Sequence, residues 1–223
     1  MLFDLRSRGR RRTIQVVYLG LAVLMGGGLV LFGVGTGTGG GGLVDALGGG
    51  GGGSGQSQAV SQEETAALKR IKQNPNDPQA WGTVLQARWT SAINGSNYGP
   101  TGFTTAGKNE LARAIQAWSR YAQLTPTSDP ALATLAARAY LALGNYAGAS
   151  SAWEKETAAS PNEPKGYECL AVNAYAAGES RKGDLAAAKA LKLIPKVQQI
   201  TTKLTLTQAK RSSTSAKSVA QGC

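Results

Sequence analysis

Apolar residues recur at helical spacing through most of the chain after residue 60, most clearly in residues 129–161. The first half of this stretch places apolar side chains three and four positions apart, at Leu132, Leu135, Ala136, Ala139, Tyr140 and Leu143. Gly144-Asn145 ends this pattern, because both residues tolerate the left-handed conformation of a helix stop. The second half carries Tyr146, Ala149, Ala152 and Trp153 on one face, and Pro161 breaks the chain. The pattern predicts two short amphipathic helices joined by a tight turn.

The same residue types return at nearly constant intervals. Three positions recur downstream at one shared interval, Ala137 as Ala171, Gly144 as Gly178 and Pro161 as Pro195. Three positions are echoed upstream at an almost equal interval, Ala149 by Ala114, Trp153 by Trp118 and Pro161 by Pro126. A single helix pair cannot bury its apolar face alone, so such units must stack on one another. An ordinary helical bundle with coincidental spacing is the alternative.

This unit resembles a tetratricopeptide (TPR) repeat, a helix–turn–helix of about 34 residues. The residues that carry the resemblance are Ala137, Tyr140, Gly144, Tyr146, Ala149, Trp153 and Pro161. It implies an all-α fold, a TPR-like stack of about three helical hairpins with capping helices, over residues 61–195. It also implies a peptide-binding groove lined by the first helix of each pair.

Several segments flank or interrupt the predicted stack. Ser61 and Glu64 form a capping pattern and predict a leading helix that ends at Asn74-Pro75. Residues 91–107 contain Asn-Gly, Gly-Pro and Thr-Gly pairs and predict an insertion loop, whose Tyr98 and Phe103 either contact a partner or pack back on the stack. Residues 196–211 predict a capping helix, and residues 212–223 predict a disordered basic tail.

The N-terminal region has a different character. Residues 1–12 are basic, residues 13–34 carry no charge, and residues 35–60 form a Gly-rich flexible linker. A helix of 22 residues reaches about 33 Å, which is enough to cross a bilayer core of about 30 Å. The arginines before it predict a single transmembrane signal-anchor helix with its N-terminus in the cytoplasm. A cleaved signal peptide and a buried soluble helix are the alternatives.

The net charge of +11 is unevenly distributed. Residues 61–188 carry twelve Lys or Arg and eleven Asp or Glu, so the excess charge lies before residue 13 and after residue 188. Because nucleic-acid binding needs a basic face on the folded domain, we expect no nucleic-acid partner. The small-residue pairs Ala22/Gly26 and Gly33/Gly37 allow a homo-oligomer through the membrane helix.

The chain has no histidine and two cysteines. The first fact excludes Ser–His–Asp and Cys–His catalysis and His-ligated metals. We expect Cys169 to be a small core residue and Cys223 to belong to the polar tail, without a disulfide between them. Glu154 and Glu156 fall on a helix exterior, so no enzymatic activity, cofactor or metal is expected.

The predicted groove is lined by residues from the first helices of the hairpins: Gln79, Gln86, Trp89, Arg138, Leu141, Lys165, Glu168, Val172 and Tyr175. Trp89, Leu141 and Tyr175 would give an apolar floor. The sequence therefore predicts a membrane-anchored protein–protein interaction scaffold or chaperone-like adaptor on the outer side of the cytoplasmic membrane. Its expected partner is a protein or peptide, whose identity the sequence does not predict. A secreted soluble binding module, produced by signal-peptide cleavage, is the alternative.

Overall fold

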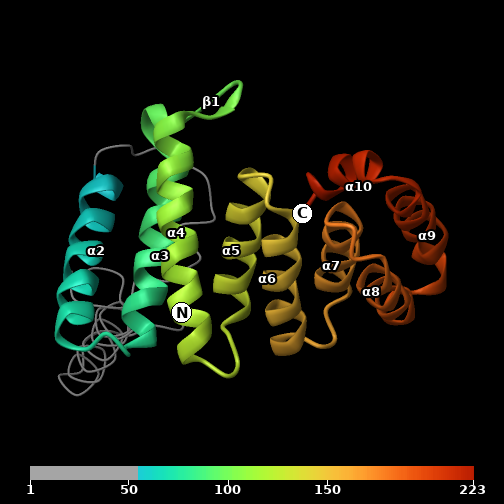
Figure 1. Cartoon of the computed structure of the whole chain (residues 1–223), viewed down its shortest axis with the longest axis horizontal. Coiled ribbons are helices and arrows are strands. Elements are labelled where there is room, and N and C mark those ends of the chain that lie inside the picture. Colours follow the sequence, from blue (N-terminus) through green and yellow to red (C-terminus); the bar gives the residue numbers. More distant parts are fainter. Residues whose placement is uncertain (1–54) are drawn as a thin grey trace, which may run out of the picture. The chain divides into compact units, whose positions relative to one another are not determined.

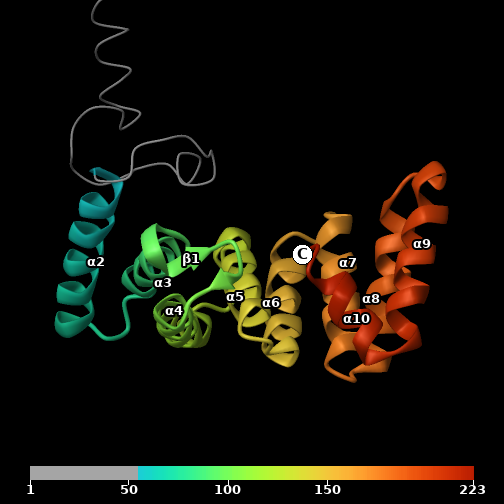
Figure 2. The same cartoon turned by 90° about the horizontal axis from the view of Figure 1, so that it is seen from above.

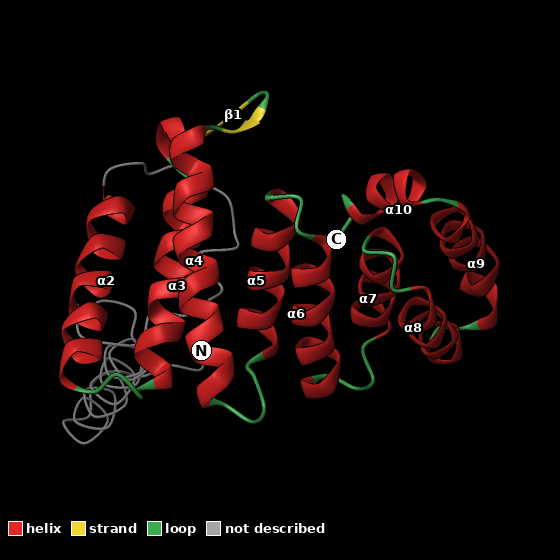
Figure 3. Ribbon diagram, in the orientation of Figure 1, coloured by secondary structure: helices red, strands yellow, loops and turns green. Residues whose placement is uncertain are grey.

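Helices make up most of residues 55–223, the part of the chain that the computed structural model describes (Figures 1 and 3). In chain order they are α2 (Gly55–Gln73), α3 (Pro78–Ile93), α4 (Thr105–Leu124), α5 (Pro130–Ala142), α6 (Tyr146–Ala159), α7 (Pro164–Ala176), α8 (Ser180–Leu193), α9 (Lys196–Arg211) and α10 (Ser213–Ala220). A short 3-10 turn, η1 (Gly95–Asn97), leads into the two-residue strands β1 (Tyr98–Gly99) and β2 (Gly102–Phe103). The expected all-α class is confirmed for this part of the chain.

The predicted basic segment 1–12, the transmembrane helix 13–34 and most of the linker 35–60 lie outside the described residues. Within residues 55–223, no helix combines the length and the apolar character that crossing a bilayer requires.

The helices pack as three antiparallel hairpins laid side by side, α3 with α4, α5 with α6, and α7 with α8. Figures 1 and 2 show these pairs following one another along the long axis of the view. Helix α2 packs on α3 at one end, and α9 packs on α7 and α8 at the other. Helix α10 turns back and packs on α7 and α9. Every hairpin thus buries its apolar face against a neighbour.

Each hairpin has a first helix, α3, α5 or α7. An aspartate caps the start of two of these helices, and a glycine follows the end of two of them. The side chains of Asp77 and Asp129 accept hydrogen bonds from free amides of the first turn of α3 and α5, ahead of a proline in each helix. The hydrogen bond from the Ala80 amide helps to hold the pKa of Asp77 below its usual value. Gly144 and Gly178 adopt φ of +72° and +80° after α5 and α7. The positive φ predicted for Gly144 is confirmed.

Alanines let the paired helices approach closely. Ala136, Ala137 and Ala139 on α5 and Ala149 on α6 are fully buried, and Trp153 fills the space beside them. A core of fully buried small side chains leaves little room for substitution, because protein interiors are close-packed.

Two predicted boundaries are wrong. Helix α2 begins at Gly55, so Ser61 lies inside it and accepts a hydrogen bond from Thr65 Oγ1 at its carbonyl oxygen rather than capping the helix. The insertion is shorter than residues 91–107, because α3 continues to Ile93 and α4 already begins at Thr105. In both places helix-compatible residues extend a helix beyond the local turn signal.

The expectations of a disordered tail at 212–223 and of no disulfide between Cys169 and Cys223 are also wrong. These residues form α10, whose Ala216 and Ala220 are fully buried, and Cys223 forms a disulfide bond with Cys169 of α7. The two Cα atoms lie 5.6 Å apart. Packing on α7 and the covalent link together order a segment whose own composition is mostly polar.

Candidate peptide-binding cleft

A cleft of about 740 Å³ lies beneath the β1–β2 hairpin. Its lining comes from α3, the hairpin, α4, α5, the start of α6 and the segment after α10. The side chains that define it are Trp89, Tyr98, Phe103, Lys108, Arg138, Leu141 and Tyr146. Ligand sites commonly have this volume. We call it the hairpin cleft.

Hydrogen bonds to backbone carbonyl oxygens hold the hairpin in place over the cleft. Asn97 Nδ2 donates to Ser91 O at 2.9 Å, and the Thr104 amide donates to Asn97 O at 2.9 Å. Gly107 in the first turn of α4 is buried against Asn97, where a Cβ atom would overlap the Asn97 carbonyl oxygen. The insertion is therefore fixed to α3 and α4 at its base.

Aromatic side chains from the hairpin form one wall of the cleft. Tyr98 and Phe103 face each other across the strand pair, with ring centroids 4.8 Å apart in an edge-to-face arrangement. Phe103 packs with Trp89 on a small core cluster that includes Leu111. Tyr98 is 51% exposed. Each aromatic residue thus follows one of the two outcomes expected for this loop. Phe103 packs on the stack, whereas Tyr98 remains exposed to solvent.

Positive charge dominates the cleft. Lys108 and Arg138 line it with exposed side chains, and its lining contains no Asp or Glu. Arg138 Nε donates a hydrogen bond to the backbone oxygen of Cys223 at 3.2 Å. Lys217 Nζ lies 5.5 Å from the centroid of the Tyr146 ring. The cleft combines aromatic surface with cations, which suits an apolar group beside an anionic one.

The residues predicted to line one groove lie in several different places in the structure. Trp89, Arg138 and Leu141 come together in the hairpin cleft. Lys165, Glu168 and Val172 line a separate cavity of about 230 Å³ between α7, α9 and the segment after α10. Gln79 is exposed and Gln86 is half-buried, and neither lines a cavity described here.

Tyr175 does not lie on the predicted groove floor. Its ring is buried over Gly183 of α8, and its hydroxyl donates to Asp184 Oδ1 at 2.8 Å. Burial and this hydrogen bond raise the pKa of Tyr175 far above its usual value. The absence of a side chain at Gly183 makes room for the tyrosine ring.

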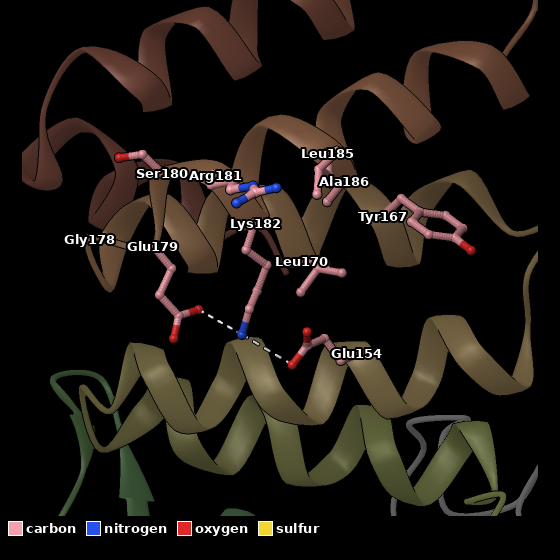
Figure 4. A pocket seen from close by; sticks show the side chains of 10 residues that line it. All are labelled: Glu154, Tyr167, Leu170, Gly178, Glu179, Ser180, Arg181, Lys182, Leu185 and Ala186. Atoms are coloured by element: carbon pink, nitrogen blue, oxygen red, sulfur yellow. Dashed lines mark hydrogen bonds and ion pairs between the residues drawn. The ribbon is translucent and has the colours of Figure 1, made fainter.

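A third cavity of about 860 Å³ lies between α6 and the α7–α8 hairpin (Figure 4). Tyr167, Leu170 and Leu185 contribute apolar surface. Lys182 Nζ contacts Glu154 Oε2 at 3.1 Å and Glu179 Oε2 at 2.9 Å. These carboxylates raise the pKa of Lys182 despite its partial burial. Because its central cation is already neutralised, this cavity fits a charged ligand less well than the hairpin cleft does.

Sequence reasoning missed three parts of the cleft: Lys108, Tyr146 and the segment 221–223. Lys108 follows directly on the insertion, and its place on α4 depends on where that helix begins. The segment 221–223 is brought to the cleft by the disulfide and by Arg138. An even cysteine count in a chain with a predicted outward-facing domain is the signal that could have indicated such a link.

Within residues 55–223, no cluster of three or more His, Cys, Asp or Glu side chains is arranged to hold a metal ion. A comparison of the sequence with models of protein families and with curated proteins found no match.

Proposed function

We propose that the chain is a membrane-anchored interaction scaffold of the tetratricopeptide type, which holds a partner peptide in the hairpin cleft. The helix boundaries support the repeat type. The offset from α5 to α7, Pro130 to Pro164 at their first residues, equals the offset from α6 to α8, Tyr146 to Ser180. This offset matches the length of a tetratricopeptide unit, about 34 residues. Helices α2 and α9 then act as the capping elements.

The hairpin cleft is the single observation that carries the proposed binding role. It gathers Trp89 from α3 and Leu141 from α5, two first helices of successive hairpins, under an aromatic wall. Aromatic and arginine side chains in a recess are the residues that most often dominate binding energies. Tyr98 and Arg138 are exposed, so both side chains are accessible to a partner.

The Cys169–Cys223 disulfide supports display on the outer side of the membrane. Disulfides persist in oxidising compartments and are rare in the cytosol. The arginines before residue 13 favour the same orientation, with the N-terminus inside. A secreted module would share the disulfide, so cell fractionation separates the two candidates. A retained anchor leaves the chain in the membrane pellet, whereas cleavage releases it to the soluble fraction outside the membrane.

Co-purification from the native cell tests the binding role. We expect the full chain, extracted in mild detergent, to retain a discrete partner that the Tyr98→Ala/Arg138→Ala variant loses by roughly tenfold or more, since hot-spot truncations typically cost about 2 kcal/mol. Arg120→Ala is the matched control, because Arg120 is exposed on α4 and bonds only to Gln123. Equal recovery with all three chains would contradict binding in the cleft.

A further inference from the structure

The outer face of α9 carries an uncovered apolar stripe. Val197, Ile200 and Leu204 are 81%, 71% and 67% exposed. Their spacing of three and four residues places them on one side of the helix. Leu206 and Ala209 are buried and hold the opposite side against the stack. Helix α9 is thus apolar on two faces, of which only one is covered.

A row of lysines runs beside this stripe. Lys196, Lys203 and Lys210 are seven residues apart, so they share one side of α9 and flank the apolar residues. Lys196 and Lys203 form no ion pair with any residue of the described stack, whereas Lys210 contacts Asp184 at 2.7 Å. From Lys189 onward the sequence holds seven Lys or Arg and no acid. The surface therefore combines exposed apolar groups with uncompensated positive charge.

The position of α9 leaves this surface accessible. Helix α9 lies at the end of the helix row, and its contacts are with α7, α8 and α10 (Figure 2). No other described helix packs over its outer side. A partner can therefore approach the stripe without displacing any part of the stack.

The charge pattern decides which partner fits. In a symmetric dimer of this chain through the stripe, the lysine rows of both copies would be brought to one interface, and like charges gathered at an interface are unfavourable. An anionic lipid surface offers phosphates to the lysines and an acyl boundary to the apolar side chains. Helices with one apolar side and lysines beside it are typical of the membrane interface.

We propose that the α9 stripe, Val197, Ile200 and Leu204 with Lys196 and Lys203, docks the stack onto an anionic bilayer surface. The apolar side chains enter the headgroup region and the two lysines contact lipid phosphates. This goes beyond partner binding in the hairpin cleft, because it sets how the scaffold lies on the membrane. A unit already tethered to the membrane needs only weak docking of this kind, since tethering raises its effective concentration at the surface.

A fluorescent probe beside the stripe tests the docking directly. Gln208 is exposed and follows Leu204 by four residues, so Gln208→Cys places a thiol on the same side of α9. Both native cysteines are in the disulfide, so a polarity-sensitive maleimide labels only the new thiol. The labelled full chain is reconstituted in vesicles of phosphatidylglycerol or of phosphatidylcholine. Ser119→Cys, on an exposed position of α4, is the control site.

We expect the emission of the Gln208→Cys label to shift to the blue in phosphatidylglycerol vesicles and not in phosphatidylcholine vesicles. Lys196→Glu/Lys203→Glu should reduce the docked fraction at least about tenfold, because each basic residue contributes roughly a fivefold factor near an anionic surface. Val197→Gln/Ile200→Gln/Leu204→Gln should also abolish the shift. All five side chains are exposed, so circular dichroism should be unchanged.

Three results would overturn the proposal. These are equal emission in the two lipids, an equal shift at the Ser119→Cys label, and a shift that grows with protein density in phosphatidylcholine, which would indicate self-association. None of them bears on the hairpin cleft, because the variants that test the cleft leave α9 intact.

Discussion

At the residue scale, two tyrosines that lie over glycines set the distance between paired helices. Tyr140 lies over Gly148 in the α5–α6 hairpin, and Tyr175 lies over Gly183 in the α7–α8 hairpin. In both places the glycine follows the tyrosine by eight residues, and a Cβ atom on it would overlap the ring. The same contact occurs in two hairpins, so it is a general feature of how helices pair in this stack.

Replacing Gly183 tests this contact. We expect Gly183→Ala to lower the free energy of unfolding by about 1–3 kcal/mol, because the added methyl group overpacks the site. The Tyr175 ring cannot easily move away, since its hydroxyl is bonded to Asp184. Thermal unfolding of the full chain in mild detergent measures the loss. Gly99→Ala is the control, as its Cβ atom would meet nothing within 4 Å. Equal melting temperatures for both variants would contradict the prediction.

Glu156, which the helical pattern predicted on a helix exterior, is instead a buried carboxylate with an unpartnered oxygen. It lies on α6 against Gly166, and its Oε2 atom has no hydrogen-bond partner among the described residues. Burial, with a smaller contribution from the negative charge of Glu163, raises the pKa of Glu156. The folded state therefore holds the proton more tightly than the unfolded state, and this group loses stabilising effect as pH rises from the unfolded pKa through the folded one.

We expect Glu156→Gln to stabilise the chain relative to the wild type at pH 7 and less so at pH 4.5, because more of the wild-type carboxyl is protonated at the lower pH. The difference in melting temperature between the two proteins, followed across this pH range, is the measurement. Comparing them at each pH cancels the effect of carboxylates with lowered pKa values, such as Asp184, which destabilise the fold as pH falls. A difference that does not change with pH, or that shrinks as pH rises, would contradict the assignment.

At the scale of elements, α10 is tied by a covalent link to α7, the first helix of the last hairpin. Cys169 and Cys223 are 54 residues apart, and α10 otherwise contributes only a few small side chains to the core. Closing a loop of this length stabilises a fold by about 4 kcal/mol in the chain-entropy model, and measured values are often smaller. Helix α10 is therefore the element most sensitive to reduction.

Hydrogen exchange under reducing conditions tests this dependence. We expect a dithiol reductant, or the Cys169→Ser/Cys223→Ser variant, to remove amide protection from α10 while α5 and α6 keep theirs. Arg138 would also lose its hydrogen bond to Cys223, so the wall of the hairpin cleft formed by residues 221–223 should open. Unchanged protection of α10 after reduction would show that its packing on α7 suffices.

Some features of these helices could be predicted from the sequence and others could not, for physical reasons. Asp77, Asp129, Gly144 and Gly178 act within one helix turn, so the ends of α3, α5 and α7 follow from local chemistry. Helix α10 could not be predicted in this way, because its order comes from α7 and a cysteine far away in the chain. Tyr175 was misplaced for a similar reason, since the glycine that receives its ring lies on the next helix.

At the scale of the whole molecule, the described stack presents two separate surfaces to which we have assigned a proposed binding role. The hairpin cleft combines aromatic residues with Arg138 and Lys108, and the α9 stripe combines aliphatic residues with Lys196 and Lys203. The periodicity of the sequence predicted three residues of the cleft, Trp89, Arg138 and Leu141, because they occupy groove-facing positions on the first helices of the hairpins. It did not predict the hairpin wall or residues 221–223, whose positions depend on tertiary contacts.

Site-specific photocross-linking in the native cell tests the central claim, that a partner binds in the hairpin cleft. A photoreactive amino acid replaces Thr101, an exposed residue of the hairpin that lines the cleft, in the full chain. A second chain carries it at Gln116, which is exposed on α4 outside the cleft. We expect a discrete cross-linked species from position 101, none from position 116, and a clear loss of the first when Arg138→Ala is added. No cross-link from position 101, or the same species from both positions, would contradict binding in the cleft.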